Sequence, residues 1–97
     1  MKRPTKLDLE AVENFVSAHE GWHTDGDALE KTFAFPTYGA GVAFAVHLGF
    51  AADKRDHHPE LNIAWGKVCV RWTTHDAGGV TALDLEVAEV ADHAYGH

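Results

Sequence analysis

The chain is poor in the residues that nucleophilic enzymes and disulfide-stapled proteins use. It has a single cysteine, Cys69, so no disulfide can form within it. Cys69 lies in an apolar segment typical of a strand, where we expect a small core or face residue rather than a reactive thiol. No serine stands in the glycine-flanked turn of a hydrolase nucleophile. Neither the cysteine nor the serine content of the chain therefore indicates covalent catalysis.

Positive charge is also scarce. Lys and Arg together number 8 against 15 Asp and Glu, which gives a formal net charge of -7. The basic residues are scattered along the chain and form no sustained cluster. Because a phosphate backbone is gripped by clustered Lys and Arg, we expect no nucleic-acid partner.

Long hydrophobic runs are missing as well. The longest apolar stretch, residues 38–52, contains His47 and is shorter than the roughly 20 residues that cross a bilayer. The start of the chain is charged and leads into a helical pattern rather than an apolar signal region. We expect a cytoplasmic protein with no membrane association.

What is present is enough for one packed domain over residues 1–97, since 45% of the residues are hydrophobic. Asp8 is a suitable N-cap, and Asp25-Gly26 is a strong hairpin signal. Periodicity and breakers predict helices over residues 8–19, 38–54 and 81–94, and strands over residues 22–24, 28–35, 61–65 and 67–73. The order α-β-β-α-β-β-α predicts an α+β fold, a four-stranded antiparallel sheet with three helices on one face.

The predicted helix over residues 38–54 is apolar nearly all the way round. Such a helix needs burial on more than one side, and one sheet can cover only one of them. We therefore expect a homodimer or homotetramer built through this helix and a sheet edge. His47, inside it, is expected to be a buried imidazole or an interface contact.

The most informative feature is a histidine constellation. An adjacent pair follows the apolar helix, and a third histidine follows a strand, before Asp76 and two glycines. Imidazoles exchange protons near neutral pH, and loops on rigid elements often carry catalytic groups. The full pattern is Asp53-x3-His57-His58-Pro59-x5-Trp65-x9-His75-x8-Asp84.

Two other interpretations of the pair are open. It can be two solvent-exposed polar residues in a loop. Alternatively, three imidazoles with Asp53 or Asp56 can supply a zinc-like ligand set. The spacing lacks a helical i, i+4 pair, however, and neighbouring His57 and His58 rarely point at one ion. We therefore predict no metal site.

The pattern, continued by THDAGG after the last strand, resembles the pterin-4a-carbinolamine dehydratases. The leading helix, the GW that opens the first strand, the F-x-F strand end and the apolar helix before HHP also fit that family. The resemblance covers essentially the whole chain. It implies dehydration of a 4a-hydroxy-tetrahydropterin to the quinonoid dihydropterin, with no metal or redox cofactor.

The resemblance also assigns roles. By that resemblance His57, His58 and His75 are the catalytic set. Our hypothesis is that His57 and His75 share the acid and base roles and that His58 mainly holds the pterin. Five further residues are expected to bind or orient the substrate or the imidazoles: Asp53, Asp56, Thr73, Thr74 and Asp76.

The remaining motif positions are interpreted as structural. Thr81 and Asp84 form nearly a capping box, so we expect Asp84 to begin the last helix. Trp65 is expected to pack the strand pair, and Pro59 to stop the helix and aim the histidines. Leu61 stands where relatives often have an aromatic residue.

A rival function belongs to another class. Some proteins that share this fold are binding or assembly modules, including Rubisco assembly factors, and some family members are dimerisation partners of transcription factors. Such non-enzymatic relatives tend to lack the complete histidine set. This chain keeps His57, His58 and His75, which favours the enzyme.

Overall fold

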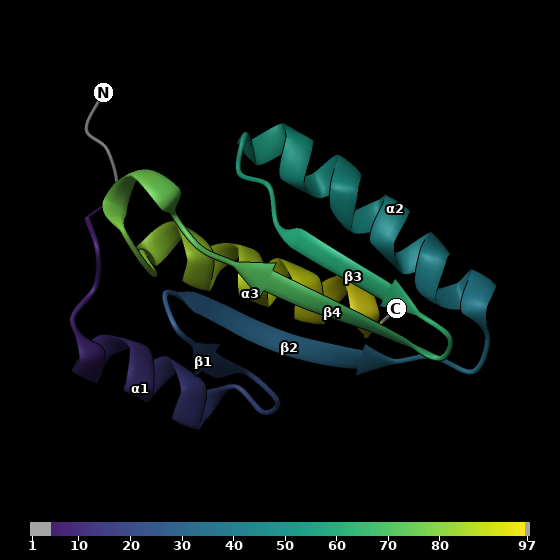
Figure 1. Ribbon diagram of the computed structural model, residues 1–97, viewed down its shortest axis with the longest axis horizontal. Coiled ribbons are helices and arrows are strands. Elements are labelled where there is room, and N and C mark those ends of the chain that lie inside the picture. The colour runs from purple at the N-terminus through teal and green to yellow at the C-terminus, as the bar shows by residue number, and fades with distance from the viewer. Residues whose placement is uncertain (1–4, 97) are drawn as a thin grey trace.

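A computed structural model describes residues 5–96 and shows an α+β fold in the predicted order (Figure 1). The sheet is antiparallel throughout, with strand order β1-β2-β4-β3, so β1 and β3 form its edges. The elements are α1 Leu9–Ala18, β1 His23–Asp25, β2 Ala28–Ala34, α2 Tyr38–Arg55, β3 Glu60–Ala64, β4 Lys67–Trp72, the short 3-10 turn η1 His75–Ala77 and α3 Ala82–Tyr95.

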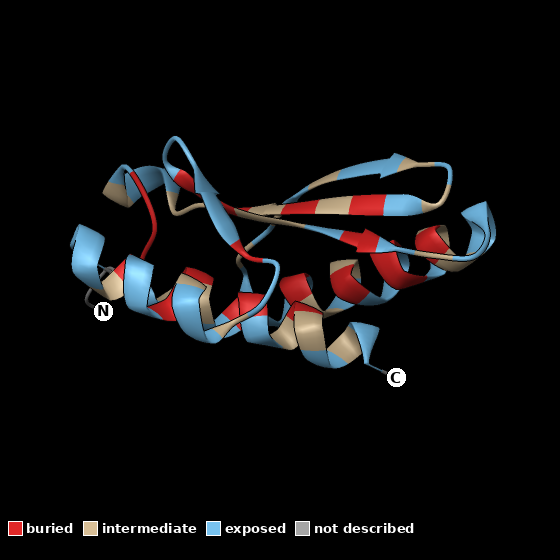
Figure 2. Ribbon diagram, turned by 90° about the horizontal axis from the view of Figure 1, so that it is seen from below, coloured by how far each residue is buried: buried red, intermediate tan, exposed pale blue. Residues whose placement is uncertain are grey.

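The helices form one layer and the sheet the other, as Figure 2 shows from the side. Alternation along the two central strands supplies the sheet's half of the core. Leu29 pairs with Trp72 and Phe33 pairs with Val68 across β2 and β4, and all four side chains are at most 1% exposed. The apolar side chains of both strands therefore face the core.

Helix α2 packs closely on this sheet along one side. Leu48 and Ala52 are buried there, and a Cβ atom at Gly41 would meet Val68 Cγ2 at 3.2 Å, so a glycine lets the helix approach β4. On the other side Val46 and Phe50 remain 54% and 68% exposed. One chain thus leaves part of the apolar surface of α2 uncovered.

The structure contradicts the expectation for Trp65 and one of the two alternatives expected for His47. Trp65 does not pack the strand pair, because it lies in the tight turn between β3 and β4, beyond the paired residues, and is 77% exposed. His47 is exposed on α2, so it is not the buried imidazole of the first alternative. Its placement in an interface stays a prediction.

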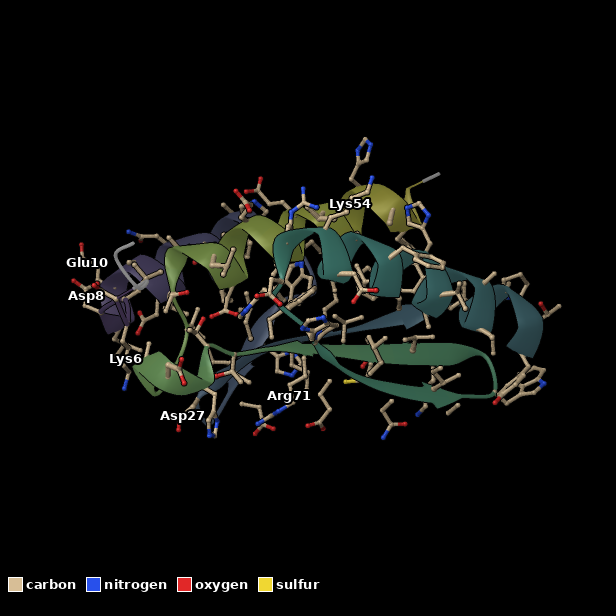
Figure 3. All side chains as sticks on the ribbon, turned by 90° about the horizontal axis from the view of Figure 1, so that it is seen from above. Lys6, Asp8, Glu10, Asp27, Lys54 and Arg71 are labelled. Carbon is tan, nitrogen blue, oxygen red and sulfur yellow. The ribbon has the colours of Figure 1, made fainter. Side chains whose placement is uncertain are left out.

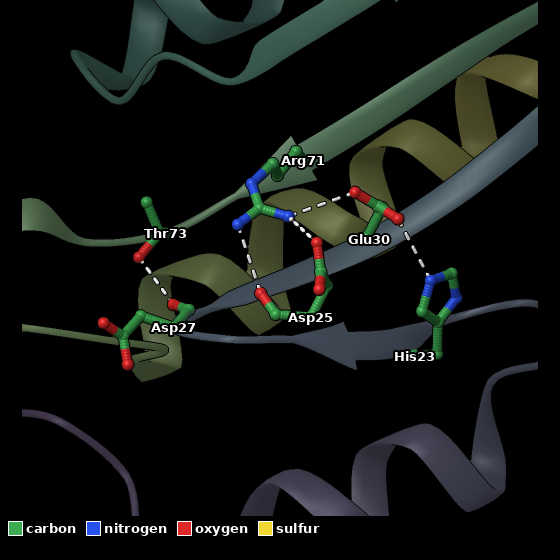
Figure 4. A network of polar contacts seen from close by, with 6 residues as sticks. All are labelled: His23, Asp25, Asp27, Glu30, Arg71 and Thr73. Atoms are coloured by element: carbon green, nitrogen blue, oxygen red, sulfur yellow. Dashed lines mark hydrogen bonds and ion pairs between the residues drawn. The ribbon is translucent and has the colours of Figure 1, made fainter.

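The face of the sheet opposite the helices carries a polar network. Arg71 on β4 donates to Asp25 Oδ2 at 2.6 Å and to Glu30 Oε2 at 3.1 Å, and Thr73 Oγ1 donates to the Asp27 carbonyl at 2.7 Å (Figure 4). Figure 3 shows Arg71 and Asp27 on this side and Lys54 on the helix side. These bonds hold the β1–β2 hairpin against the end of β4, just before the third histidine.

Among the helices of residues 5–96, none is both long enough and apolar enough to span a bilayer.

Candidate functional site

The chain leaves α2 through a left-handed turn that directs the histidine pair. Asp56 caps the helix with φ 49°, and its N–H donates to the Ala52 and Asp53 carbonyls. The N–H of His57 also donates to the Ala52 carbonyl, at 3.2 Å. Asp tolerates this conformation better than most residues, so the turn is compatible with its sequence. The reversal brings His57 against the end of β4.

His57 is held by two neighbours from different elements. Its Nε2 lies 2.6 Å from Asp84 Oδ1 in the first turn of α3. Its ring stacks on the indole of Trp72, the last residue of β4, with ring centroids 5.7 Å apart and planes 12° from parallel. The His57 side chain is 11% exposed and the Asp84 side chain 0%. This imidazole is therefore fixed in place, with a small part of it open to solvent.

Asp84 begins α3, as predicted, through a capping box. Its Oδ2 accepts the Thr81 N–H at 2.9 Å, and the Thr81 hydroxyl completes the box. The same Oδ2 accepts the Thr74 hydroxyl at 2.7 Å, and the Thr74 and Thr81 hydroxyls are 2.8 Å apart. A fully buried carboxylate is costly unless its oxygens are bonded, and here both oxygens accept hydrogen bonds.

His75 lies at the start of a closed loop between β4 and α3. The Thr74 N–H donates to the Gly79 carbonyl at 3.0 Å, and the Gly78 N–H donates to the His75 carbonyl at 3.1 Å. Gly78 adopts φ 76°, a conformation that side chains other than glycine rarely take. The loop therefore presents an exposed His75 from a backbone that closes on itself.

The three histidines predicted as catalytic line one hollow of about 290 Å³. Four of the five residues predicted to bind or orient line it as well. Its residues are Asp56, His57, His58, Thr73, Thr74, His75 and Asp76. The structure thus brings residues 56–58, at the exit of α2, together with residues 73–76, which lie at least 15 positions later in the chain.

The fifth residue, Asp53, reaches this group through His58. Asp53 Oδ1 lies 3.0 Å from His58 Nε2, and the two side chains are 69% and 58% exposed. His58 also borders a second hollow of about 350 Å³, which Phe50 and Leu61 help to line. His58 therefore stands at the rim between the histidine hollow and the uncovered side of α2.

Volume alone does not mark this site. A hollow of about 590 Å³ lies between β2, α2 and the end of α3, and one of about 360 Å³ lies beside α1 and the hairpin. Among the described residues, the first is lined by one histidine, His47, and the second by none. Imidazoles are the side chains that most often transfer protons near neutral pH, and three of them converge on the smaller histidine hollow, which is therefore the candidate site.

Metal ligation was the main alternative use of these side chains. Within residues 5–96, no three or more His, Cys, Asp or Glu side chains gather as ligands for one metal ion. The Nε2 atoms of His57 and His58 instead each face a different carboxylate.

A family model described as pterin 4 alpha carbinolamine dehydratase matches residues 5–94, nearly the whole chain. The chain belongs to this family. One relative of this chain in the family is a protein of Rhizobium meliloti that is provisionally named a pterin-4-alpha-carbinolamine dehydratase. The two are 42% identical over 94 residues, which cover 95% of this chain and 90% of the relative.

Two solved structures share the dehydratase fold. A transcriptional coactivator/pterin dehydratase from Brucella melitensis superposes with a TM-score of 0.88 at 31% identity, covering 95% of this chain and 100% of that one. A pterin dehydratase-like protein identified as a RuBisCO assembly factor in the alpha-carboxysome superposes with a TM-score of 0.66 at 23% identity, covering 80% and 93%. The second likeness concerns the fold alone.

Sequence reasoning missed the partner of His57. Asp53 and Asp56 were expected to orient the imidazoles, and Asp84 was assigned only to the start of α3. Asp84 is 27 residues from His57, so no local spacing links them. The one available signal was that the capping box places Asp84 in the first turn of a helix directly after the His75 loop.

Proposed function

We propose that this member of the dehydratase family is a hydro-lyase that converts a 4a-hydroxy-tetrahydropterin to the quinonoid dihydropterin and water in tetrahydrobiopterin recycling. The observation that carries the proposal is the histidine hollow, in which an anchored imidazole and an exposed imidazole face the same space. It is supported by a family match that spans residues 5–94.

The reaction moves two protons. The C4a–O bond breaks as the departing hydroxyl gains a proton and leaves as water, and the neighbouring ring N–H loses its proton as the C=N bond forms. No electrons are exchanged with a second molecule, so no redox cofactor is needed. Two imidazoles in opposite protonation states suit these steps, and a positioned acid or base is worth about 10²–10⁴-fold in rate.

The three histidines have different surroundings, which support different roles. His57, anchored on Asp84, and His75, presented by the closed loop, share the base and acid roles. His58 is held by Asp53 at the rim and mainly binds the pterin.

The other residues that line the hollow also fall into two groups, which bind the substrate or orient the site. Asp56 and Asp76 line the hollow, where their carboxylates can accept hydrogen bonds from substrate N–H groups. Thr73 and Thr74 orient the site instead of binding substrate, because their hydroxyls donate to the Asp27 carbonyl and to Asp84.

The protein acts as a homodimer or homotetramer built through α2 and a sheet edge. Val46 and Phe50 on α2 and Ile63 on the edge strand β3 are 54%, 68% and 39% exposed. Large apolar side chains grouped in this way commonly mark an interface between subunits.

The alternative function is a non-catalytic binding, assembly or dimerisation module. The observation in its favour is the same uncovered side of α2, which a different protein can also cover, and the fold occurs in a RuBisCO assembly factor. The complete histidine set favours the enzyme, since a binding module has no use for imidazoles that face a shared hollow.

One assay separates these functions and a metal-dependent one. Purified protein is added, with and without a chelator, to freshly generated 4a-hydroxy-tetrahydropterin, whose loss is followed by absorbance. We expect acceleration that the chelator does not change. No acceleration over the uncatalysed rate would favour the binding module, and activity lost to the chelator would indicate a metal site.

A further inference from the structure

We propose that Asp84 is a positioning residue that holds His57 in its Nε2–H tautomer, so that Nδ1 is the nitrogen that exchanges a proton with the substrate. The part of this inference that concerns catalysis rests on the proposed dehydratase function. The tautomer itself does not, because it follows from the hydrogen bonds around the carboxylate.

The two oxygens of Asp84 have separate partners. Oδ2 accepts the Thr81 N–H at 2.9 Å and the Thr74 hydroxyl at 2.7 Å, while Oδ1 faces His57 Nε2 at 2.6 Å. An ionised carboxylate can only accept hydrogen bonds, so the imidazole must donate. In a neutral imidazole one nitrogen donates and the other accepts. Nε2 therefore carries the hydrogen and Nδ1 the lone pair.

The surroundings leave Nδ1 as the nitrogen that can serve a ligand. Nε2 is committed to a carboxylate that is 0% exposed, and one face of the ring lies against Trp72. His57 nevertheless lines the histidine hollow. A proton that passes between His57 and a molecule in that hollow thus passes through Nδ1.

The network that sets this arrangement is shielded by the N-terminal segment. The Leu7 N–H donates to the Val80 carbonyl at 2.9 Å, Lys6 forms a β-bridge with Thr81, and Thr81 is 0% exposed. Water is kept from the Thr81 side of the carboxylate, so Oδ2 keeps its two donors and Oδ1 stays directed at His57.

The substitution Asp84→Asn tests the arrangement with almost no change of shape. The backbone N–H of Thr81 still needs an acceptor, so the amide oxygen takes the Oδ2 position and the capping box persists. The amide NH₂ then occupies the Oδ1 position and donates to His57 Nε2. Nε2 becomes the acceptor and the hydrogen moves to Nδ1, which can no longer take a proton. The base is blocked while the fold is kept, as happens when the buried aspartate of a serine-protease triad is made asparagine.

The experiment follows the ring nitrogens of His57 by NMR through a pH series, in the wild-type protein and in Asp84→Asn, and assigns the tautomer of the neutral imidazole. We expect an Nε2–H signature in the wild type and an Nδ1–H signature in the variant. We also expect kcat to fall by at least about 10²-fold with little change in KM, the worth of a positioned base. Asp92→Asn is the matched control, since it alters another α3 carboxylate that binds Trp22 and Lys31. It should change neither the tautomer nor kcat.

An Nδ1–H signature in the wild type would overturn the inference, as would an Asp84→Asn protein that keeps both the Nε2–H form and full kcat. The wild-type spectrum decides the tautomer even if the variant does not fold. If the wild type shows the Nε2–H form but does not dehydrate the pterin, the proposed function fails and the tautomer assignment stands.

Discussion

His57 and His58 are neighbours in the sequence, yet their Nε2 atoms face carboxylates on different helices. His57 lies 2.6 Å from Asp84 on α3 and its side chain is 11% exposed, whereas His58 lies 3.0 Å from Asp53 on α2 and is 58% exposed. A rigid, largely buried imidazole suits proton transfer, and an exposed one at the rim suits contact with a ligand that enters and leaves. The two adjacent histidines therefore differ in burial and suit different roles.

Replacing the histidines one at a time should distinguish proton transfer from substrate binding. We expect His57→Ala and His75→Ala each to lower kcat by about 10²–10⁴-fold, because a positioned acid or base is lost. His58→Ala should act mainly on KM. The measurement is steady-state dehydration of 4a-hydroxy-tetrahydropterin.

His23→Ala is the control for these variants, since His23 is an exposed imidazole that binds Glu30 on the far face of the sheet. It should keep full activity. Unchanged kcat in both His57→Ala and His75→Ala would contradict the proposed roles.

A charge on the uncovered side of α2 should disrupt assembly. Phe50 is 68% exposed, and Phe50→Asp would place a charge in the proposed interface, where it would be desolvated without a partner. We expect a shift from oligomer toward monomer, measured by size-exclusion chromatography with light scattering. Leu9→Asp, at an α1 residue that is 70% exposed, should leave the assembly intact. A wild-type protein that is monomeric at micromolar concentration would rule the interface out.

The single cysteine should react slowly with alkylating reagents. Burial raises the pKa of the Cys69 thiol above its usual value; a hydrogen bond with Thr32 opposes this and Glu30 adds to it. Because the thiolate is the reactive form, a raised pKa lowers the reactive fraction at any pH below it. We expect iodoacetamide to modify Cys69 more slowly than a free thiol at mildly alkaline pH, with the difference narrowing as the pH rises. Faster modification than the free thiol would contradict this.

Loss of one core side chain of α2 should cost much of the stability. Leu48 is 0% exposed in the core between α2 and the sheet. Leu48→Ala should lower the free energy of unfolding by about 2–5 kcal/mol, since it removes buried methyl groups and leaves a cavity. Urea denaturation at a fixed protein concentration measures this, because assembly also affects stability. Leu9→Ala should change the free energy of unfolding by no more than about 0.5 kcal/mol, because Leu9 is exposed. An equal loss of stability in both variants would contradict the prediction.

Local elements were predictable because they follow from short-range rules. Asp8 caps α1 by accepting the Ala11 N–H at 2.9 Å, and alternation over residues 67–73 identified the buried face of β4. The strand order β1-β2-β4-β3 was not predictable, since periodicity does not say which strands pair. Trp65 was misplaced for a related reason: an aromatic residue beside a glycine fits a strand end or a turn equally well.

The site was predictable only as far as the resemblance carried it. The motif named the three histidines, and the structure places them around one hollow. The pairing of His57 with Asp84 needed the tertiary structure, because it depends on how the end of α2 meets the start of α3. The stacking of His57 on Trp72 likewise depends on the position of β4 in the sheet.

Asp84 caps α3 and also holds His57. If catalysis were lost, the helix cap would still be needed, but the contact with His57 would not. The Thr81 N–H must be satisfied wherever this helix begins, so a descendant that served only as a scaffold would still gain from keeping Thr81 and Asp84. Retention of that aspartate in a protein of this fold is therefore no sign of a working enzyme. The diagnostic position is the one opposite it, because nothing in the helix cap requires an imidazole at His57.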